Sequence, residues 1–157
     1  MNNKEEVFVT NGFEETQRLG EKFIGDVLRL HLEGASSNIA LYGDLGRVKT
    51  TFVQGMAKGL GIKRRIISPT YIIVRSYKIT IKHQVLGIKY FYHIDLYRVE
   101  GRGIEGLGLE EIMEDTQNIV VIEWAEKLGD LLPKKRWDVG LEYLGEDKRK
   151  ITIKKHG

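Results

Sequence analysis

The sequence predicts an α/β fold in which helices flank a mixed, mainly parallel β-sheet. The first observation is a short apolar run, 38–42, of the kind found in parallel strands buried on both faces. A glycine-containing loop follows this run directly and leads into a helical pattern. A second apolar run, 118–123, and a late pair of strand-forming segments add further strands. Helices that alternate with buried strands pack in layers on a sheet.

Length and composition indicate an ordinary globular chain, which we interpret as one domain over residues 1–157. Hydrophobic residues make up 41% and charged residues 30%, and the net charge of +3 permits contact with nucleic acid without indicating it. The absence of cysteine excludes disulfides and cysteine-ligated metal sites. No apolar run approaches the roughly 20 residues that span a bilayer, and the N-terminus lacks a secretion signal. We therefore expect a cytoplasmic protein that does not enter a membrane.

The N-terminal part is predicted to contain a strand within 5–10 and a helix over 14–33. Apolar residues recur in this helix at three- to five-residue steps, and Thr16 near its start is a candidate N-cap. The buried strand 38–42 follows. A second helix is predicted over 50–60, because four apolar residues fall on one side of it: Phe52, Val53, Met56 and Leu60.

The rest of the chain is rich in strand-forming residues. The predicted strands are 71–77, 90–95, 118–123, 137–144 and 150–155, with a hairpin made by 79–81 and 85–88. We expect short helices at 109–113 and 126–132 and a mobile glycine-rich loop at 101–108. In the basic segment 148–155, cationic and β-branched residues are interleaved, which favours an exposed edge strand protected by its lysines. An RNA contact is the alternative.

The loop Gly43–Thr50, GDLGRVKT, follows the phosphate-binding pattern G-x-x-x-x-G-K-[ST] at every fixed position except Val48. In such a loop the backbone N–H groups face the phosphates and the next helix adds positive potential. Lys49 would reach the β- and γ-phosphates, and the Thr50 hydroxyl would ligate magnesium. The loop stands between a buried strand and a helix, which is the context that the pattern requires.

Val48 departs from the pattern at its most demanding position. Glycine is favoured there because it tolerates a positive φ, which is an outlier for a β-branched residue. If the usual geometry is kept, we expect about 1–3 kcal/mol of strain, together with methyl groups in the phosphate cradle. Arg47 would offset part of this loss by adding a cation, or would bend over the mouth of the site.

Two carboxylates follow buried strands, Asp95 after 90–94 and Glu123 after 118–122. A phosphate-binding loop needs such a residue on a neighbouring strand to hold magnesium or to orient the attacking water. The alternative is that acidic residues stand at these strand ends because strand ends meet water. Both carboxylates in one chain with Lys49 and Thr50 favour a nucleotide site.

Other polar and aromatic residues are less decisive. Ser68 and Thr70 stand in a turn whose hydroxyls would sense a γ-phosphate, or which simply starts a strand. We interpret His93 as a structural histidine rather than a base. Trp124 is interpreted as a packing residue, with stacking on a nucleotide base as the alternative.

These segments, taken in order, resemble the TsaE family, small bacterial P-loop ATPases that act in forming threonylcarbamoyladenosine on tRNA. The matching segments are E-T-x-x-L-G at 15–20, L-Y-G-D-L-G with K-T-T-F at 41–52, S-P-T-Y at 68–71, H-I-D-L-Y-R at 93–98, G-L-E-E at 108–111 and I-E-W-A-E at 122–126. No single motif decides the resemblance, but their common order is specific.

The resemblance implies a P-loop NTPase-like three-layer fold that binds ATP or ADP with Mg²⁺ and has weak ATPase activity. It also implies association with the TsaB–TsaD heterodimer, and with tRNA indirectly through that complex. Hydrolysis would support turnover of the complex.

Site residues carry over by position from the family's motifs. The implied catalytic residues are Lys49, Asp95 and Glu123, and the implied metal ligands are Thr50, Asp95 and Glu123. The implied nucleotide-binding residues are Thr16, Gly43, Asp44, Leu45, Gly46, Arg47, Val48, Lys49, Thr50, Thr51, Thr70 and Trp124. The alternative to a working ATPase is a scaffold protein of the same fold, whose nucleotide site is impaired by Arg47 and Val48.

Overall fold

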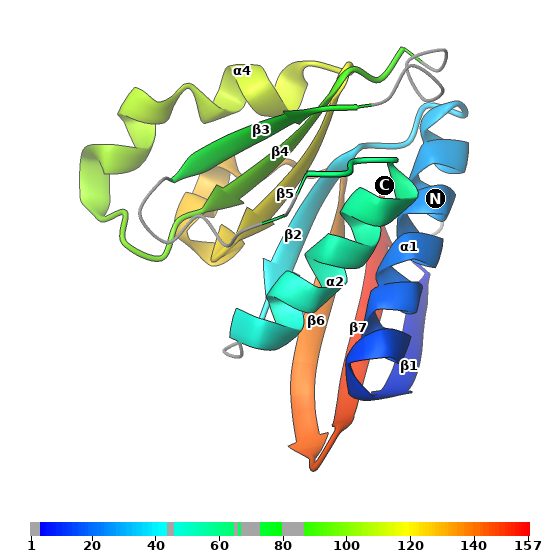
Figure 1. Cartoon of the computed structure of the whole chain (residues 1–157). Helices are drawn as coiled ribbons and strands as arrows, with labels where there is room; N and C mark the ends of the chain where they lie inside the picture. Colours follow the sequence, from blue (N-terminus) through cyan, green and yellow to red (C-terminus); the bar gives the residue numbers. More distant parts are fainter. Residues whose placement is uncertain (1–3, 44–45, 65, 67–72, 80–86) are drawn as a thin grey trace.

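The computed structural model describes residues 4–43, 46–64, 66, 73–79 and 87–157. In chain order (Figure 1) the elements are β1 (Glu5–Asn11), α1 (Gly12–His31), β2 (Asn38–Tyr42), α2 (Gly46–Gly59), β3 (Val74–Lys78), β4 (Tyr90–Asp95), the 3-10 helix η1 (Gly101–Leu107), α4 (Leu109–Glu114), β5 (Asn118–Glu123), the 3-10 helix η2 (Ala125–Leu131), β6 (Arg136–Gly145) and β7 (Lys148–His156). Asp44, Leu45, Thr70, the Arg47 side chain and most of the predicted hairpin at 79–88 lie outside the described part.

The strands form one seven-stranded sheet in the order β1-β7-β6-β2-β5-β4-β3. The four neighbours β6, β2, β5 and β4 are mutually parallel, whereas β3, β7 and β1 join by antiparallel pairings. Because two antiparallel pairings separate β1 from β6, β1 runs in the same direction as the parallel group. The mixed, mainly parallel sheet is therefore confirmed.

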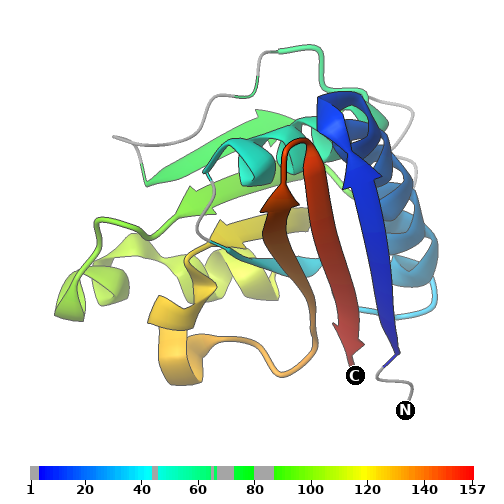
Figure 2. The same ribbon diagram turned by 90° about the horizontal axis from the view of Figure 1, so that it is seen from below.

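Helices cover both faces of the sheet, as Figure 2 shows from below. Strand side chains alternate between the faces, so Ile39 and Val121 pack in one apolar cluster, with residues of α1 and α2. Ala40 and Val120 lie in the other cluster, with residues of α4, η1 and η2. The two clusters make the three-layer arrangement that the sequence predicts. Within the described residues, no helix combines the length and apolar character needed to cross a bilayer.

Helices α1 and α2 cross closely because glycine occupies their contact. A Cβ added at Gly20 would overlap the backbone of Phe52, and one added at Gly55 would overlap the backbone of Gln17. Phe23 of α1 extends this contact to the sheet, with its ring 5.6 Å from Phe52 and 5.4 Å from Trp137 between centroids. This crossing sets the place of α2, whose first turn carries Lys49.

Thr16 does not cap α1. The helix begins at Gly12, its N-cap Asn11 makes no side-chain capping bond, and Thr16 lies inside the helix and is buried. Its hydroxyl donates to the carbonyl of Gly12 at 3.1 Å and shares a 2.7 Å hydrogen bond with the Thr10 hydroxyl. A threonine inside a helix satisfies its hydroxyl through the carbonyl four residues earlier, which is the pattern seen here.

The basic segment 148–155 does not form an edge strand. It makes up most of β7, which pairs with β1 on one side and β6 on the other. Ile151 and Ile153 are buried, and Lys154 stands between Glu5 and Asp138 in the sheet register. Interleaved cationic and β-branched residues indicate one solvent face, a property that edge and interior strands share.

The segment expected as a mobile loop at 101–108 is also different. Residues 101–107 form the 3-10 helix η1, and Gly108, with φ of 68°, leads into α4. Two of its residues, Ile104 and Leu107, pack against the apolar cluster beneath α4, to which the preceding Val99 belongs, and this apolar packing orders the segment.

Candidate functional site

The predicted catalytic residues gather where the parallel strands β2, β4 and β5 end, which we call the carboxyl edge. Asp95 ends β4 and stands opposite Glu123, which ends β5. Leu41 of β2 is also in register with Glu123, so the loop that starts at Gly43 emerges beside them. Ligands of open α/β sheets bind at this edge.

The strand period explains why these side chains share one face. Every second residue of a strand faces the same side, so one face of β4 carries Phe91, His93 and Asp95. The corresponding face of β5 carries Val121 and Glu123. Phe91 and Val121 belong to the apolar cluster that includes Phe52 of α2. His93, Asp95 and Glu123 therefore lie on the α2 side, above an apolar floor.

Glu123 is the centre of a buried polar group. Its side chain is 3% exposed, with Oε1 3.7 Å from Nζ of Lys49 and Oε2 2.5 Å from Nε2 of His93. The side chains of Lys49 and His93 are 4% and 0% exposed. Charges withdrawn from water in this way are tolerated only when they face each other and are hydrogen-bonded. His93, which we interpreted as structural, thus belongs to the site. The sequence signal for this was its spacing of two residues from Asp95, which puts both side chains on the same face of the strand.

Asp95 is half-buried beside this group. Its Oδ1 accepts a hydrogen bond from the backbone N–H of Tyr97 at 2.9 Å. Burial raises the pKa of Asp95, and the nearby charge of Glu123 acts in the same direction, while the Tyr97 hydrogen bond opposes both. Two carboxylates that face one region suit a hard cation with oxygen ligands.

The described residues hold no cluster of three His, Cys, Asp or Glu side chains that would by itself bind a metal ion. A site with two carboxylates and the Thr50 hydroxyl fits Mg²⁺, which keeps several waters and takes oxygens from a substrate phosphate. It does not fit zinc, which needs three or four protein ligands. The chemistry of the residues present would therefore fit a magnesium ion better than zinc.

Trp124 stands at a strained turn immediately after Glu123. Its φ of 59° and ψ of 41° are left-handed, which is uncommon for a residue with a side chain. The indole packs against the Tyr97 ring in a tilted arrangement, with 5.1 Å between centroids, and Lys49 Nζ lies 5.1 Å from the indole centroid. Lys127 donates to the carbonyls of Tyr97 and Val99 at 2.5 and 3.2 Å, which holds this turn in place. Trp124 thus packs, as predicted, against residues of the site.

The first glycine of the loop is required by its surroundings. Gly43 has a φ of 134°, and a Cβ there would overlap the carbonyl oxygen of Leu141 on β6. Helix α2 already begins at Gly46. The four N–H groups at the start of a helix have no partner inside it, so they remain available to an anion.

Val48 does not have a positive φ in this structure, so the backbone strain that we expected at this residue is absent. The residue lies in the first turn of α2, is 5% exposed and packs in the apolar cluster of α1 and α2. Among the described residues, only Trp124 and Glu146 combine a side chain with a positive φ. An apolar β-branched side chain gains free energy by burial, and Val48 obtains that burial by joining the helix.

The remaining predicted site residues lie around this group. Thr50 and Thr51 follow Lys49 in the first turns of α2, and Thr51 is buried. Thr16 lies on α1, which starts at the same edge because β1 runs in the direction of the parallel strands. The Thr16 hydroxyl already donates a hydrogen bond to the carbonyl of Gly12.

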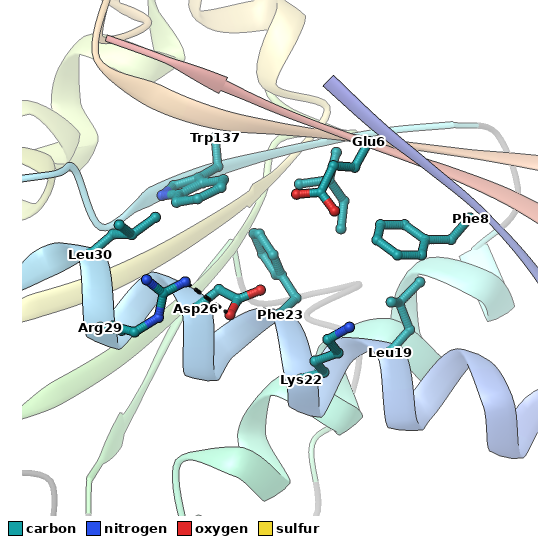
Figure 3. A pocket seen from close by; sticks show the side chains of 10 residues that line it. Glu6, Phe8, Leu19, Lys22, Phe23, Asp26, Arg29, Leu30 and Trp137 are labelled. Atoms are coloured by element: carbon teal, nitrogen blue, oxygen red, sulfur yellow. Dashed lines mark hydrogen bonds and ion pairs between the residues drawn. The ribbon is translucent and has the colours of Figure 1, made fainter. Parts of the chain in front are cut away.

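A separate hollow lies between α1 and the strands β1, β7 and β6 (Figure 3). Phe8, Phe23 and Trp137 line it, and the ion pair Arg29–Asp26 stands at its rim with a 3.4 Å separation. Its volume is about 80 Å³, which is space for only a few water molecules. This hollow is a small gap in the packing and carries no group of catalytic side chains.

Comparison with known proteins identifies the family to which this chain belongs. The chain matches the family described as "Threonylcarbamoyl adenosine biosynthesis protein TsaE" over residues 10–151. This chain belongs to the TsaE family. TsaE of Haemophilus influenzae is 37% identical, with 87% of this chain and 80% of that protein covered. TsaE of Treponema pallidum is 34% identical, with 92% and 97% covered.

A solved structure supports the same relationship. The crystal structure of YdiB from Bacillus subtilis superposes with a TM-score of 0.69 at 29% identity, covering 100% of this chain and 89% of that one. The TsaE resemblance and the P-loop NTPase-like fold class predicted from the sequence are therefore confirmed.

Proposed function

We propose that this TsaE-family protein binds ATP or ADP with Mg²⁺ at the carboxyl edge and hydrolyses ATP slowly. The observation that carries the proposal is the buried group of Lys49, Glu123 and His93, with Asp95 beside it, at the start of α2. A buried lysine at a helix N-terminus is suited to bind a phosphate, because its ammonium and the helix N-terminus supply positive potential to the same place.

Each residue has a separate task in this proposal. The N–H groups at the start of α2 and the Lys49 ammonium bind the phosphates. Thr50 and Asp95 hold Mg²⁺, which when bound neutralises charge on the phosphate oxygens. Glu123 orients the attacking water and accepts its proton. Lys49 exchanges its ion pair with Glu123 for the phosphates, which frees one carboxylate oxygen of Glu123 for the water.

We further propose that hydrolysis supports tRNA threonylcarbamoyladenosine synthesis by the TsaB–TsaD heterodimer, with tRNA bound by that complex. The family name and the resemblance support this assignment. The experiment is reconstitution of the modification with the three proteins, ATP and tRNA. Wild-type protein should sustain several turnovers per complex, and Lys49→Ala should permit only about one. Equal turnover with both would contradict a role for ATP hydrolysis.

The second candidate function is a scaffold protein that docks without using ATP. Its support is Val48, which is buried in the core as part of α2, so that the helix begins at Gly46. Wrapping this loop around phosphates in the usual way would withdraw Val48 from the core. That withdrawal would cost about 1.5–3 kcal/mol, which equals a ten- to hundredfold or greater loss of affinity.

Calorimetric titration with ATP and Mg²⁺ tests both functions. We expect Val48→Gly to bind ATP at least tenfold more tightly than wild type, because glycine releases the loop from the core. The same variant should lose stability, since it removes a buried side chain and adds glycine to a helix. Val48→Ala is the matched control: it reduces bulk but keeps a helical residue, and should gain less affinity.

Equal affinities of wild type and Val48→Gly would contradict this account of Val48. No binding by wild type at millimolar ATP would favour the scaffold function.

A further inference from the structure

His93 is a fully buried polar side chain on β4, with 0% exposure. Its Nε2 lies 2.5 Å from Oε2 of Glu123, and its Nδ1 has no partner in the described part of the chain. A carboxylate can only accept hydrogen bonds, so a hydrogen bond between His93 and a Glu123 carboxylate requires the hydrogen to be on Nε2. In the neutral Nε2–H tautomer, Nδ1 has no hydrogen, and no buried N–H is left unsatisfied.

The two oxygens of Glu123 are divided between partners from different elements. Oε1 faces Lys49 of α2, and Oε2 accepts from His93 of β4. Under the proposed function Lys49 turns to the phosphates, so its hold on Glu123 weakens when the nucleotide binds. His93 lies on the central sheet, where it pairs with Val121 two residue pairs before the Asp95–Glu123 pair in the register. The exchange of the Lys49 ion pair under the proposed function does not require the His93–Glu123 hydrogen bond to break.

We propose that His93 is a positioning residue that holds Glu123 in one orientation for the reaction. This inference rests on the proposed ATPase function. Without the His93 donor, the carboxylate would turn about its side-chain bonds once Lys49 has left, and would face the water for only part of the time. Groups that hold a reacting side chain in place in this way contribute to kcat through preorganisation.

The kinetic test separates positioning from binding. His93→Leu removes the donor at similar size, and we expect kcat for ATP hydrolysis to fall about 10–100-fold while KM for ATP changes less than about threefold. His93→Gln places an amide N–H near the position of Nε2 and should restore kcat to within about fivefold of wild type. A folded His93→Leu protein with wild-type kcat would overturn the proposal.

Phe91→Leu is the control for a purely structural effect. Phe91 lies on the same strand and face as His93, is fully buried, and makes no polar contact with Glu123. We expect it to lower the melting temperature but to leave kcat within about twofold of wild type. If kcat instead follows the melting temperature through all three variants, His93 is structural only and the proposal fails.

A spectroscopic test does not depend on ATPase activity. In protein labelled with ¹⁵N-histidine, long-range NMR correlations should show His93 as the Nε2–H tautomer, with a low-field N–H proton that is lost in Glu123→Ala. The His93→Gln variant assigns the signal among the four histidines. If wild type hydrolyses no ATP, the proposed function fails, while this measurement still decides the His93–Glu123 bond. A Nδ1–H tautomer would overturn that bond.

Discussion

Val48 shows at the scale of one residue how a motif position and a core position can coincide. In the loop pattern it is the residue that should be glycine, and by itself it indicates a damaged phosphate site. In the structure it is a buried residue of α2 that belongs to the apolar cluster to which α1 also contributes. Burial of this side chain therefore favours a helix that begins at Gly46, and under the proposed function the cost that Val48 adds to nucleotide binding comes from leaving the core.

The environment of the Asp95 carboxyl makes the stability of the fold depend on pH. Burial first, and then the charge of Glu123, raise the pKa of Asp95 above its ordinary value of 3.8. The folded chain therefore holds this proton more tightly than the unfolded chain. The stability that Asp95 contributes is fully present below the unfolded pKa and is lost as pH rises through the folded pKa.

Asp95→Asn should accordingly raise the free energy of unfolding at neutral pH, because the amide removes the buried charge and keeps an oxygen for the Tyr97 N–H. Urea unfolding without Mg²⁺, at several pH values from acidic to neutral, measures the effect. The difference between variant and wild type should grow as pH rises. A difference that is constant with pH would show that the carboxyl does not titrate in this way.

At the scale of elements, the crossing of α1 and α2 determines where Lys49 is presented. The helices touch through Gly20 and Gly55, whose missing side chains let the two backbones approach. Lys49 is six residues before Gly55 on the same helix. A shift of α2 at the crossing therefore moves the lysine relative to Glu123 on the sheet.

Gly55→Ala should destabilise the protein by about 1–3 kcal/mol, because its Cβ would overlap the Gln17 carbonyl and force the helices apart. It should also weaken ATP binding severalfold by moving Lys49. Thermal unfolding and calorimetry measure the two effects. Gly25→Ala on α1 is the matched control, since nothing lies near its Cβ, and it should stabilise by about 0.5–1 kcal/mol. Equal effects of both changes would contradict the close crossing.

At the scale of the whole molecule, the candidate site exists only in the folded chain. Lys49, Asp95 and Glu123 come from three elements that the sheet topology brings to one edge. The unfolded chain cannot present the same group to a nucleotide. Ligand binding should therefore stabilise the complete fold by mass action.

ATP with Mg²⁺ at 100 times its dissociation constant should stabilise wild type by about 2.7 kcal/mol, which for a chain of this size raises the melting temperature by roughly 5–10 °C. Differential scanning calorimetry measures this shift. Lys49→Ala, which lacks the phosphate cation, should show little shift at the same ATP concentration. A wild-type protein that ATP does not stabilise at any concentration would point to the scaffold function.

Much of this fold could be predicted from local patterns. The strands 90–95 and 118–123 have the bounds predicted for them, because each is a short apolar run that ends in a carboxylate. The interior place of β7 could not be predicted, since its alternation records one buried face but not how many neighbours the strand has. The start of α1 was also missed, because Thr16 suits a cap and a helix interior equally well.

The sequence by itself determined the fold class, the TsaE resemblance and the carboxylates at the strand ends. These features can be recognised in the sequence because hydrophobic periodicity and motifs depend on the order of residues along the chain. Only the tertiary structure decided that His93 faces Glu123, that Lys49 pairs with the same carboxylate and that Val48 is buried. These contacts join residues from separate elements, and their distances depend on strand register and helix crossing, which no local pattern records.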